Sequence, residues 1–217
     1  MEKKERKKPV GYYNYTVILT YVGFCAGFYG IVQAVSGNVY IALICLMICG
    51  VCDMFDGTIA AMRERTKEEK AFGSYIDSLS DMVCFGLLPG SILYGFGVKD
   101  FWGYAVMIFF ALAALIRLAY FDVQELFADR KEGEKRTHFI GLPVTNAAIF
   151  LPGLMAIDLF VGLDYSMVYL AGLVLVGAAF VTPFKMKKLY MPWLLIPAFI
   201  GLCFFAVIII FGGKLNP

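Results

Sequence analysis

The sequence has few charged residues, and no segment of it reads as a cleavable leader. Only 17% of the residues are charged, whereas 60% are hydrophobic and the mean hydropathy is +0.75. Residues 1–8 run directly into a long apolar segment without a small-residue cleavage site, so we expect no secretory signal peptide. A cytosolic globular protein needs no apolar runs of this length and number. The composition therefore predicts a polytopic membrane protein.

A clustered basic surface and paired cysteines are also missing. The basic residues are scattered among acidic ones and match no recognisable binding module, which argues against nucleic acid as a partner. Cys45, Cys49 and Cys52 share one helical face, a spacing that invites a soft-metal interpretation. No histidine accompanies them, and zinc sites usually use CxxC pairs on loops. We therefore interpret all six thiols as small apolar residues and expect no disulfide framework.

The long apolar stretches number seven, and each approaches the ~20 residues that a helix needs to cross ~30 Å of hydrocarbon. They cover residues 11–35, 38–62, 73–97, 101–123, 142–162, 165–182 and 189–211. Their apolar runs are unbroken, whereas barrel strands alternate and are about half as long, so we predict helices. The expected fold is an all-α, polytopic membrane helix bundle of about six to seven transmembrane helices, forming one integral membrane domain over residues 1–217.

The positions of lysine and arginine predict the orientation of these spans. With a cytoplasmic N-terminus, sixteen of the 19 basic residues fall in inner segments, and only Lys99 and Lys214 fall in outer ones. This asymmetry follows the positive-inside rule through all seven spans and places the 63–72 loop in the cytoplasm. The basic residues near the N-terminus either determine topology alone or also contact the headgroups of anionic membrane lipids.

Four aspartates lie within 29 residues on two adjacent apolar stretches: Asp53, Asp56, Asp77 and Asp81. An ionised carboxylate in a membrane helix costs at least about 2.5–3.5 kcal/mol on insertion scales, so it indicates a function. Spacings of three and four residues place each pair on one helix face, and the short intervening loop makes the helices antiparallel neighbours. Both pairs then lie on the cytoplasmic half, where they can converge on one cavity.

Such close carboxylates repel one another, and all-oxygen ligation suits hard divalent cations such as Mg²⁺, Mn²⁺ or Ca²⁺. Two such ions would suit phosphoryl chemistry. Gly57 and Ala60 extend the same helix face without bulk and leave room for a flat or phosphate-bearing ligand. The alternatives are aspartates exposed to water at helix ends, or the ion path of a cation transporter. A transporter would spread carboxylates through the membrane depth, but the outer half offers little beyond Asp158.

The strings DMFDGTIA (53–60) and GSYIDSLSD (73–81) closely resemble the D-x-x-D-G-x-x-A…G-x-x-x-D-x-x-x-D signature of the CDP-alcohol phosphotransferases. IDSLSDMVCFGLLPG (76–90), IRLAYFDV (116–123) and FIGLPVTNAA (139–148) resemble runs of the phosphatidylserine synthase branch of that family. The resemblance covers roughly residues 11–150. It implies a membrane enzyme that transfers a phosphatidyl group from CDP-diacylglycerol to L-serine and releases CMP.

The resemblance also implies a cofactor and roles for the aspartates. Asp53 and Asp77 would bridge two Mg²⁺ or Mn²⁺ ions, Asp56 would complete one site and Asp81 the other. Asp81 also matches the general base that takes the proton of the attacking hydroxyl. Members of the family form homodimers, and the site is expected to face the cytoplasm from the cell (inner) membrane.

Further positions match parts of the family that contact the cytidine diphosphate: Gly57, Ala60, Gly73, Asn14 and Thr16. One position departs from the pattern, because the arginine that follows the signature alanine is Ala61 here. The stretch from there to Gly73 is also about three residues longer than usual. Arg63 or Arg65 would have to reach back from this loop to replace the missing cation, since a guanidinium fork is hard to replace at a phosphate.

The acceptor is predicted to meet Arg117, Asp122 and Arg136. Serine carries a carboxylate and an ammonium, so its pocket needs a cation and an acceptor of hydrogen bonds. Arg117 lies within the fourth span and either pairs with a buried anion or extends to the inner interface. Tyr120 and Asp122 stand where the family run has a second arginine and an asparagine. Two alternatives within the family remain: a sister enzyme that uses glycerol 3-phosphate or an inositol phosphate, and a catalytically weakened or inactive member.

Overall fold

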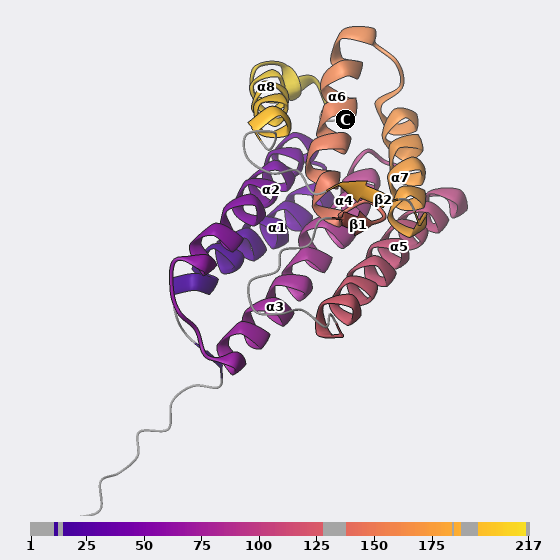
Figure 1. The fold of residues 1–217 in the computed structure, drawn as a ribbon. Coiled ribbons are helices and arrows are strands. Elements are labelled where there is room, and N and C mark those ends of the chain that lie inside the picture. Colours follow the sequence, from indigo (N-terminus) through magenta and orange to yellow (C-terminus); the bar gives the residue numbers. More distant parts are fainter. Residues whose placement is uncertain (1–10, 13–14, 128–137, 184, 188–194, 216–217) are drawn as a thin grey trace, which may run out of the picture.

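The described residues of this computed structural model are 11–12, 15–127, 138–183, 185–187 and 195–215. They form eight α-helices (Figure 1): α1 Ile18–Val35, α2 Val39–Ala61, α3 Lys67–Asp81, α4 Leu88–Gly95, α5 Phe101–Leu126, α6 Ala147–Val161, α7 Tyr165–Val181 and α8 Leu195–Phe211. Short 3-10 turns add η1 Tyr15–Val17, η3 Val144–Asn146 and η4 Gly212–Leu215, and a π-helical segment, η2 Met82–Leu87, joins α3 to α4.

The helices confirm a polytopic membrane bundle. Five are long and apolar enough to cross a membrane, counting Lys67–Gly95 as one continuous rod of 29 residues, and α7 and the last helix are shorter apolar helices. Beside the helices, the described residues form one small antiparallel sheet, β1 His138–Ile140 with β2 Lys185–Lys187. This sheet, which the sequence did not predict, ties the segment before α6 to the segment after α7.

The start of the third helix differs from the prediction. We expected the helix from residue 73 after a loop over 63–72, but α3 begins at Lys67. Thr66 is the reason: its side chain accepts the N–H of Glu69, and the Glu69 carboxylate accepts the N–H of Thr66, a capping box that satisfies two helix-end donors. The connection from α2 to α3 is therefore only residues 62–66, with Lys70 already on the helix.

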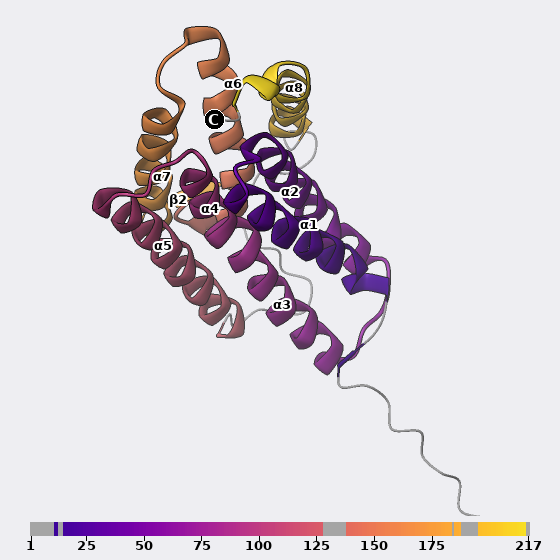
Figure 2. The same cartoon turned by 180° about the vertical axis from the view of Figure 1, so that it is seen from behind.

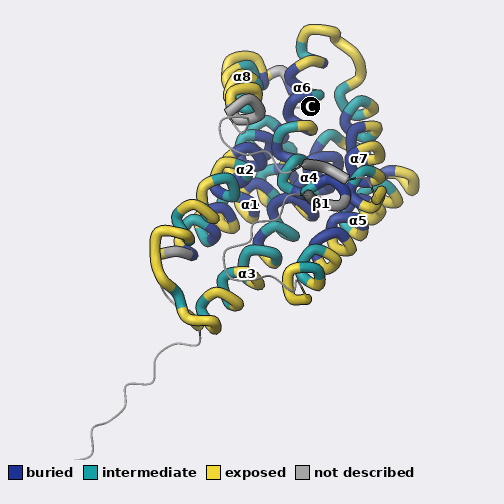
Figure 3. Tube along the Cα trace, in the orientation of Figure 1, coloured by how far each residue is buried: buried dark blue, intermediate teal, exposed yellow. Residues whose placement is uncertain are grey.

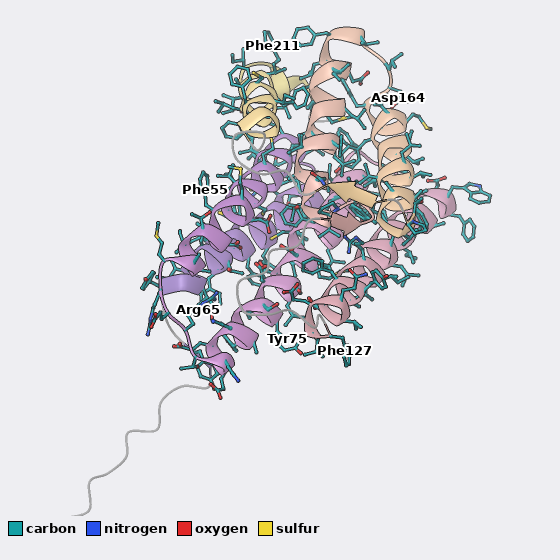
Figure 4. All side chains as sticks on the ribbon, viewed as in Figure 1. Phe55, Arg65, Tyr75, Phe127, Asp164 and Phe211 are labelled. Carbon is teal, nitrogen blue, oxygen red and sulfur yellow. The ribbon has the colours of Figure 1, made fainter. Side chains whose placement is uncertain are left out.

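Three connections can be placed at the two ends of the bundle. Arg65, between α2 and α3, and Phe127, after α5, lie toward one end, and Asp164, between α6 and α7, lies at the other (Figure 4). Asp164 accepts the N–H of Ser166 at 3.0 Å and begins α7. This arrangement matches the alternation expected from the basic residues.

Glycines bring α1 against its neighbours. Viewed from behind, α1 crosses α2 and lies beside α3 and α4 (Figure 2). A Cβ at Gly27 would lie 2.6 Å from Cys84 Sγ, and one at Gly30 would lie 2.8 Å from Cys45 Cβ. These small residues let the helices pack closely, and the buried residues gather where the helices meet (Figure 3).

Replacing Gly27 by Ala is expected to destabilise the fold by about 1–3 kcal/mol, because the added methyl would overlap the Cys84 thiol and approach its backbone. Thermal unfolding of the detergent-solubilised protein measures the effect. Gly201→Ala is the matched control, since a Cβ at Gly201 on α8 meets no atom within 4 Å. An equal melting temperature for the two variants would contradict this packing.

Candidate metal centre and active site

Three of the four aspartates converge between α2 and α3. Asp53 and Asp56 lie three residues apart on one face of α2, and Asp77 faces them from α3. One carboxylate oxygen from each lies within 4.8 Å of the other two, and all three side chains are half-buried. The predicted convergence of the two helices is confirmed for these three residues.

Asp81 lies one helical turn beyond Asp77 and outside that group of three. It lines a small cavity, together with the other aspartates and with Thr20, Ser80 and Cys84. The cavity volume is about 10 Å³, close to the space that one water molecule occupies. Asp81 therefore lies at the end of the carboxylate cluster that is farther from the connection between α2 and α3.

The donor set fits hard divalent cations. Among the residues that the structure describes, no lysine or arginine forms a salt bridge with any of the four aspartates. Carboxylates held this close repel one another unless a positive charge lies between them. Oxygen-only ligands suit Mg²⁺ and Mn²⁺, and the thiols of Cys49 and Cys84 are engaged elsewhere, with the carbonyl oxygen of Gly23 at 3.3 and 3.4 Å.

The face of α2 beside this cluster is open. Gly57 is exposed, and a Cβ built there would meet no atom within 4 Å. Ala60, one turn further, lines a larger cavity of about 540 Å³ at the connection to α3. The structure therefore leaves the space for a ligand that the sequence predicted beside Gly57 and Ala60.

The basic residues of the connection lie in different surroundings. Arg63 pairs with Glu69 at 3.9 Å, and its side chain is 42% exposed. Arg65 is half-buried, and its Nη1 lies 3.1 Å from the position of a Cβ on Gly73. Asn14 lies outside the described residues, and of Thr16 only the backbone, in η1, is described.

Of the two predicted acceptor residues on α5, Arg117 is buried and Asp122 is half-buried. The burial of Arg117 disagrees with the second of its two interpretations, extension to the inner interface. Its Nε donates to the carbonyl oxygen of Leu142 at 3.1 Å, and its guanidinium lies over the Phe121 ring. Asp122 is half-buried and accepts the hydroxyl of Ser78 at 2.7 Å. Arg136 lies outside the described residues.

Two features of the site were not predicted. The first is the hydrogen bond from the hydroxyl of Ser78, the neighbour of Asp77 on α3, to the carboxylate of Asp122 on α5. Ser78 and Asp122 are 44 residues apart in the sequence. The π-helical segment η2 begins directly after Asp81, and such segments frequently occur at functional sites. Gly86 and Pro89 are its only signal in the sequence, because Pro89 has no N–H to bond one turn back.

Comparison with known proteins identifies the family. Residues 13–184 match the CDP-alcohol phosphatidyltransferase family, which is most of the chain and extends beyond the resemblance found over residues 11–150. The chain belongs to the CDP-alcohol phosphatidyltransferase family. The family consists of membrane enzymes, and its use of divalent metal agrees with the carboxylate cluster.

Three relatives carry names of serine-lipid synthases. The chain is 32% identical over 111 residues to CDP-diacylglycerol–serine O-phosphatidyltransferase of Saccharomyces cerevisiae, covering 50% of this chain and 39% of that protein. It is 27% identical over 147 residues to the enzyme of the same name from Mycobacterium tuberculosis, covering 65% and 48%. Archaetidylserine synthase of Methanothermobacter thermautotrophicus is 28% identical over 134 residues, covering 61% and 53%. The matches span about half or less of each relative.

Proposed function

We propose that this protein transfers the phosphatidyl group of CDP-diacylglycerol to the hydroxyl of L-serine, forming phosphatidylserine and CMP. The observation that carries the proposal is the carboxylate cluster between α2 and α3 in a chain of this family. The serine synthase names of the relatives support the choice of acceptor. The site would lie on the cytoplasmic side of the cell membrane, as the basic residues of the connecting segments suggest. The protein would act as a homodimer.

The carboxylates have distinct parts in this proposal. Asp53, Asp56 and Asp77 would hold the divalent ions, with Asp81 completing the second site. Bound Mg²⁺ or Mn²⁺ would stabilise the charge that develops on the phosphate oxygens. Asp81, at the end of the cluster farther from the 62–66 connection, would take the proton of the serine hydroxyl as the hydroxyl oxygen attacks the phosphatidyl phosphorus. The bond from that phosphorus to the bridging oxygen breaks, and CMP leaves with this oxygen.

The acceptor would lie between α3 and α5. Asp122 is one hydrogen bond away from Ser78, the neighbour of Asp77, so its carboxylate lies close to the reacting centre. A carboxylate there would attract the ammonium of serine and repel the phosphate of glycerol 3-phosphate or an inositol phosphate. Buried Arg117, on the same helix, would supply the positive charge for the serine carboxylate.

Asp122→Asn is expected to raise the KM for serine about tenfold or more, because a hydrogen bond to a charged group contributes about 1.5–3 kcal/mol. The smaller change in kcat separates loss of acceptor binding from damage to the metal centre. Asp164→Asn, the same substitution at the opposite end of the bundle, is the matched control and should leave KM unchanged. An unaltered KM in Asp122→Asn would remove this residue from the acceptor pocket.

The choice of acceptor is tested by offering L-serine, glycerol 3-phosphate and myo-inositol 1-phosphate separately, with CDP-diacylglycerol and Mn²⁺. CMP release with serine alone is expected. Faster release with either phosphorylated alcohol would keep the family and replace the acceptor.

A further inference from the structure

The connection between α2 and α3 fixes the position of Arg65. The capping box of Thr66 and Glu69 sets the direction of the chain directly after this residue, with hydrogen bonds of 3.0 and 3.2 Å. Arg65 therefore holds a fixed position directly before the N-cap of α3. Figure 4 places it where the end of α2 meets α3.

The guanidinium of Arg65 lies along α3 on the side that carries the aspartates. Nη1 is 3.1 Å from the place where Gly73 would carry a Cβ. Gly73 and Asp77 are four residues apart and share one helix face. The positive charge therefore lies about one turn before the carboxylate cluster, and the missing side chain of Gly73 leaves the room for it.

One donor of this guanidinium is unused. Nε of Arg65 is buried and has no hydrogen-bond partner among the residues that the structure describes. A buried donor on a charged group is unfavourable unless an acceptor meets it. Because Arg63 is paired with Glu69 and its side chain is 42% exposed, Arg65, with its buried Nε, is the inward cation of the connection.

An open cavity of about 540 Å³ adjoins Arg65. Its lining includes three cations, Arg63, Arg65 and Lys70, and one carboxylate, Glu64; with Glu69 paired to Arg63, one positive charge remains in excess. Ala61 also lines it, at the end of α2. An excess of positive charge beside a cluster of metal-ligating carboxylates favours an anion that both can contact, and a phosphate ester meets this requirement.

We propose that Arg65 binds a phosphate group in this cavity and replaces the cation that is absent after Ala60, with Gly73 making room for its guanidinium. The phosphate belongs either to the nucleotide of the donor or to the headgroup of an anionic lipid, and the guanidinium recognises both in the same way. The assignment to the donor rests on the proposed function. The binding itself does not.

Calorimetric titration of CDP into the full-length protein in neutral detergent with Mg²⁺ tests the nucleotide. Arg65→Gln is expected to weaken CDP binding about tenfold or more, the scale of one lost charge-assisted contact. Arg65→Lys should recover part of the affinity, because a point charge replaces the fork. The double variant Ala61→Arg with Arg65→Gln should bind CDP more tightly than Arg65→Gln alone, since position 61 lines the same cavity. Lys99→Ala, at the opposite end of the bundle, is the control for loss of a positive charge.

Native mass spectrometry of the same variants in vesicles of phosphatidylglycerol and phosphatidylcholine tests the lipid. Fewer phosphatidylglycerol adducts on Arg65→Gln, with unchanged CDP affinity, would assign the phosphate to a headgroup. Unchanged CDP affinity together with unchanged adducts would overturn the proposal. Loss of CDP binding by the unsubstituted protein, with adducts that still depend on Arg65, would instead remove the nucleotide and with it the proposed function.

Discussion

Asp81→Asn is expected to lower the rate of CMP release by about 10²–10⁴-fold, the range that general acid–base catalysis contributes. Asparagine has nearly the same volume and keeps an oxygen that can meet a cation, but it cannot take a proton from the attacking hydroxyl. Because Asp81 lies outside the group of three carboxylates within 4.8 Å, the substitution should leave the ion site formed by that group in place.

Asp77→Asn is the matched comparison for Asp81→Asn. It removes one carboxylate of the group of three, so it should weaken Mn²⁺ binding as well as turnover. Electron paramagnetic resonance of free Mn²⁺ measures the binding, and CMP release measures the turnover. If Asp81→Asn kept more than about a tenth of the rate, Asp81 would not be the general base.

Gly57→Ala is expected to lower the rate about 10²-fold while the protein remains folded and becomes slightly more stable. A Cβ at this exposed position meets no protein atom within 4 Å, and alanine is favoured over glycine in a helix interior by about 0.5–1 kcal/mol. The loss must then come from the ligand, because a displacement of about 1 Å at a reacting centre can reduce the rate by 10²-fold.

Thr58→Ala is the control for this substitution, since Thr58 is the exposed neighbour of Gly57 on α2. The melting temperature and the rate of CMP release are measured on both variants. Full activity in Gly57→Ala would mean that no ligand approaches the face of α2 beside Asp56, and the donor would have to lie elsewhere.

The parts of this molecule that depend on local spacing could be predicted from the sequence. Apolar runs gave the spans because the thickness of the hydrocarbon sets their length. The separation of Asp53 from Asp56 placed both on one side of α2 because the helix repeat fixes it. The short connection to α3 makes the two helices antiparallel neighbours, which allows the convergence with Asp77.

Contacts that depend on how helices are rotated against each other could not be predicted. The bond between Ser78 and Asp122 joins α3 to α5, and no sequence spacing relates the two residues. Arg117 had two open interpretations, and its burial and its bond to the carbonyl oxygen of Leu142, which argue against extension to the interface, follow from no sequence spacing. The start of α3 was misplaced because the apolar pattern begins later than the capping box of Thr66.

Product analysis tests the central claim most directly. The purified protein is incubated with CDP-diacylglycerol, isotope-labelled L-serine and Mg²⁺, and the lipid products and CMP are quantified by mass spectrometry. Labelled phosphatidylserine and CMP in equal amounts, both abolished by a chelator and by Asp81→Asn, is the predicted result. CMP without labelled lipid, or no product from folded protein, would contradict serine-dependent phosphatidyl transfer at the carboxylate cluster.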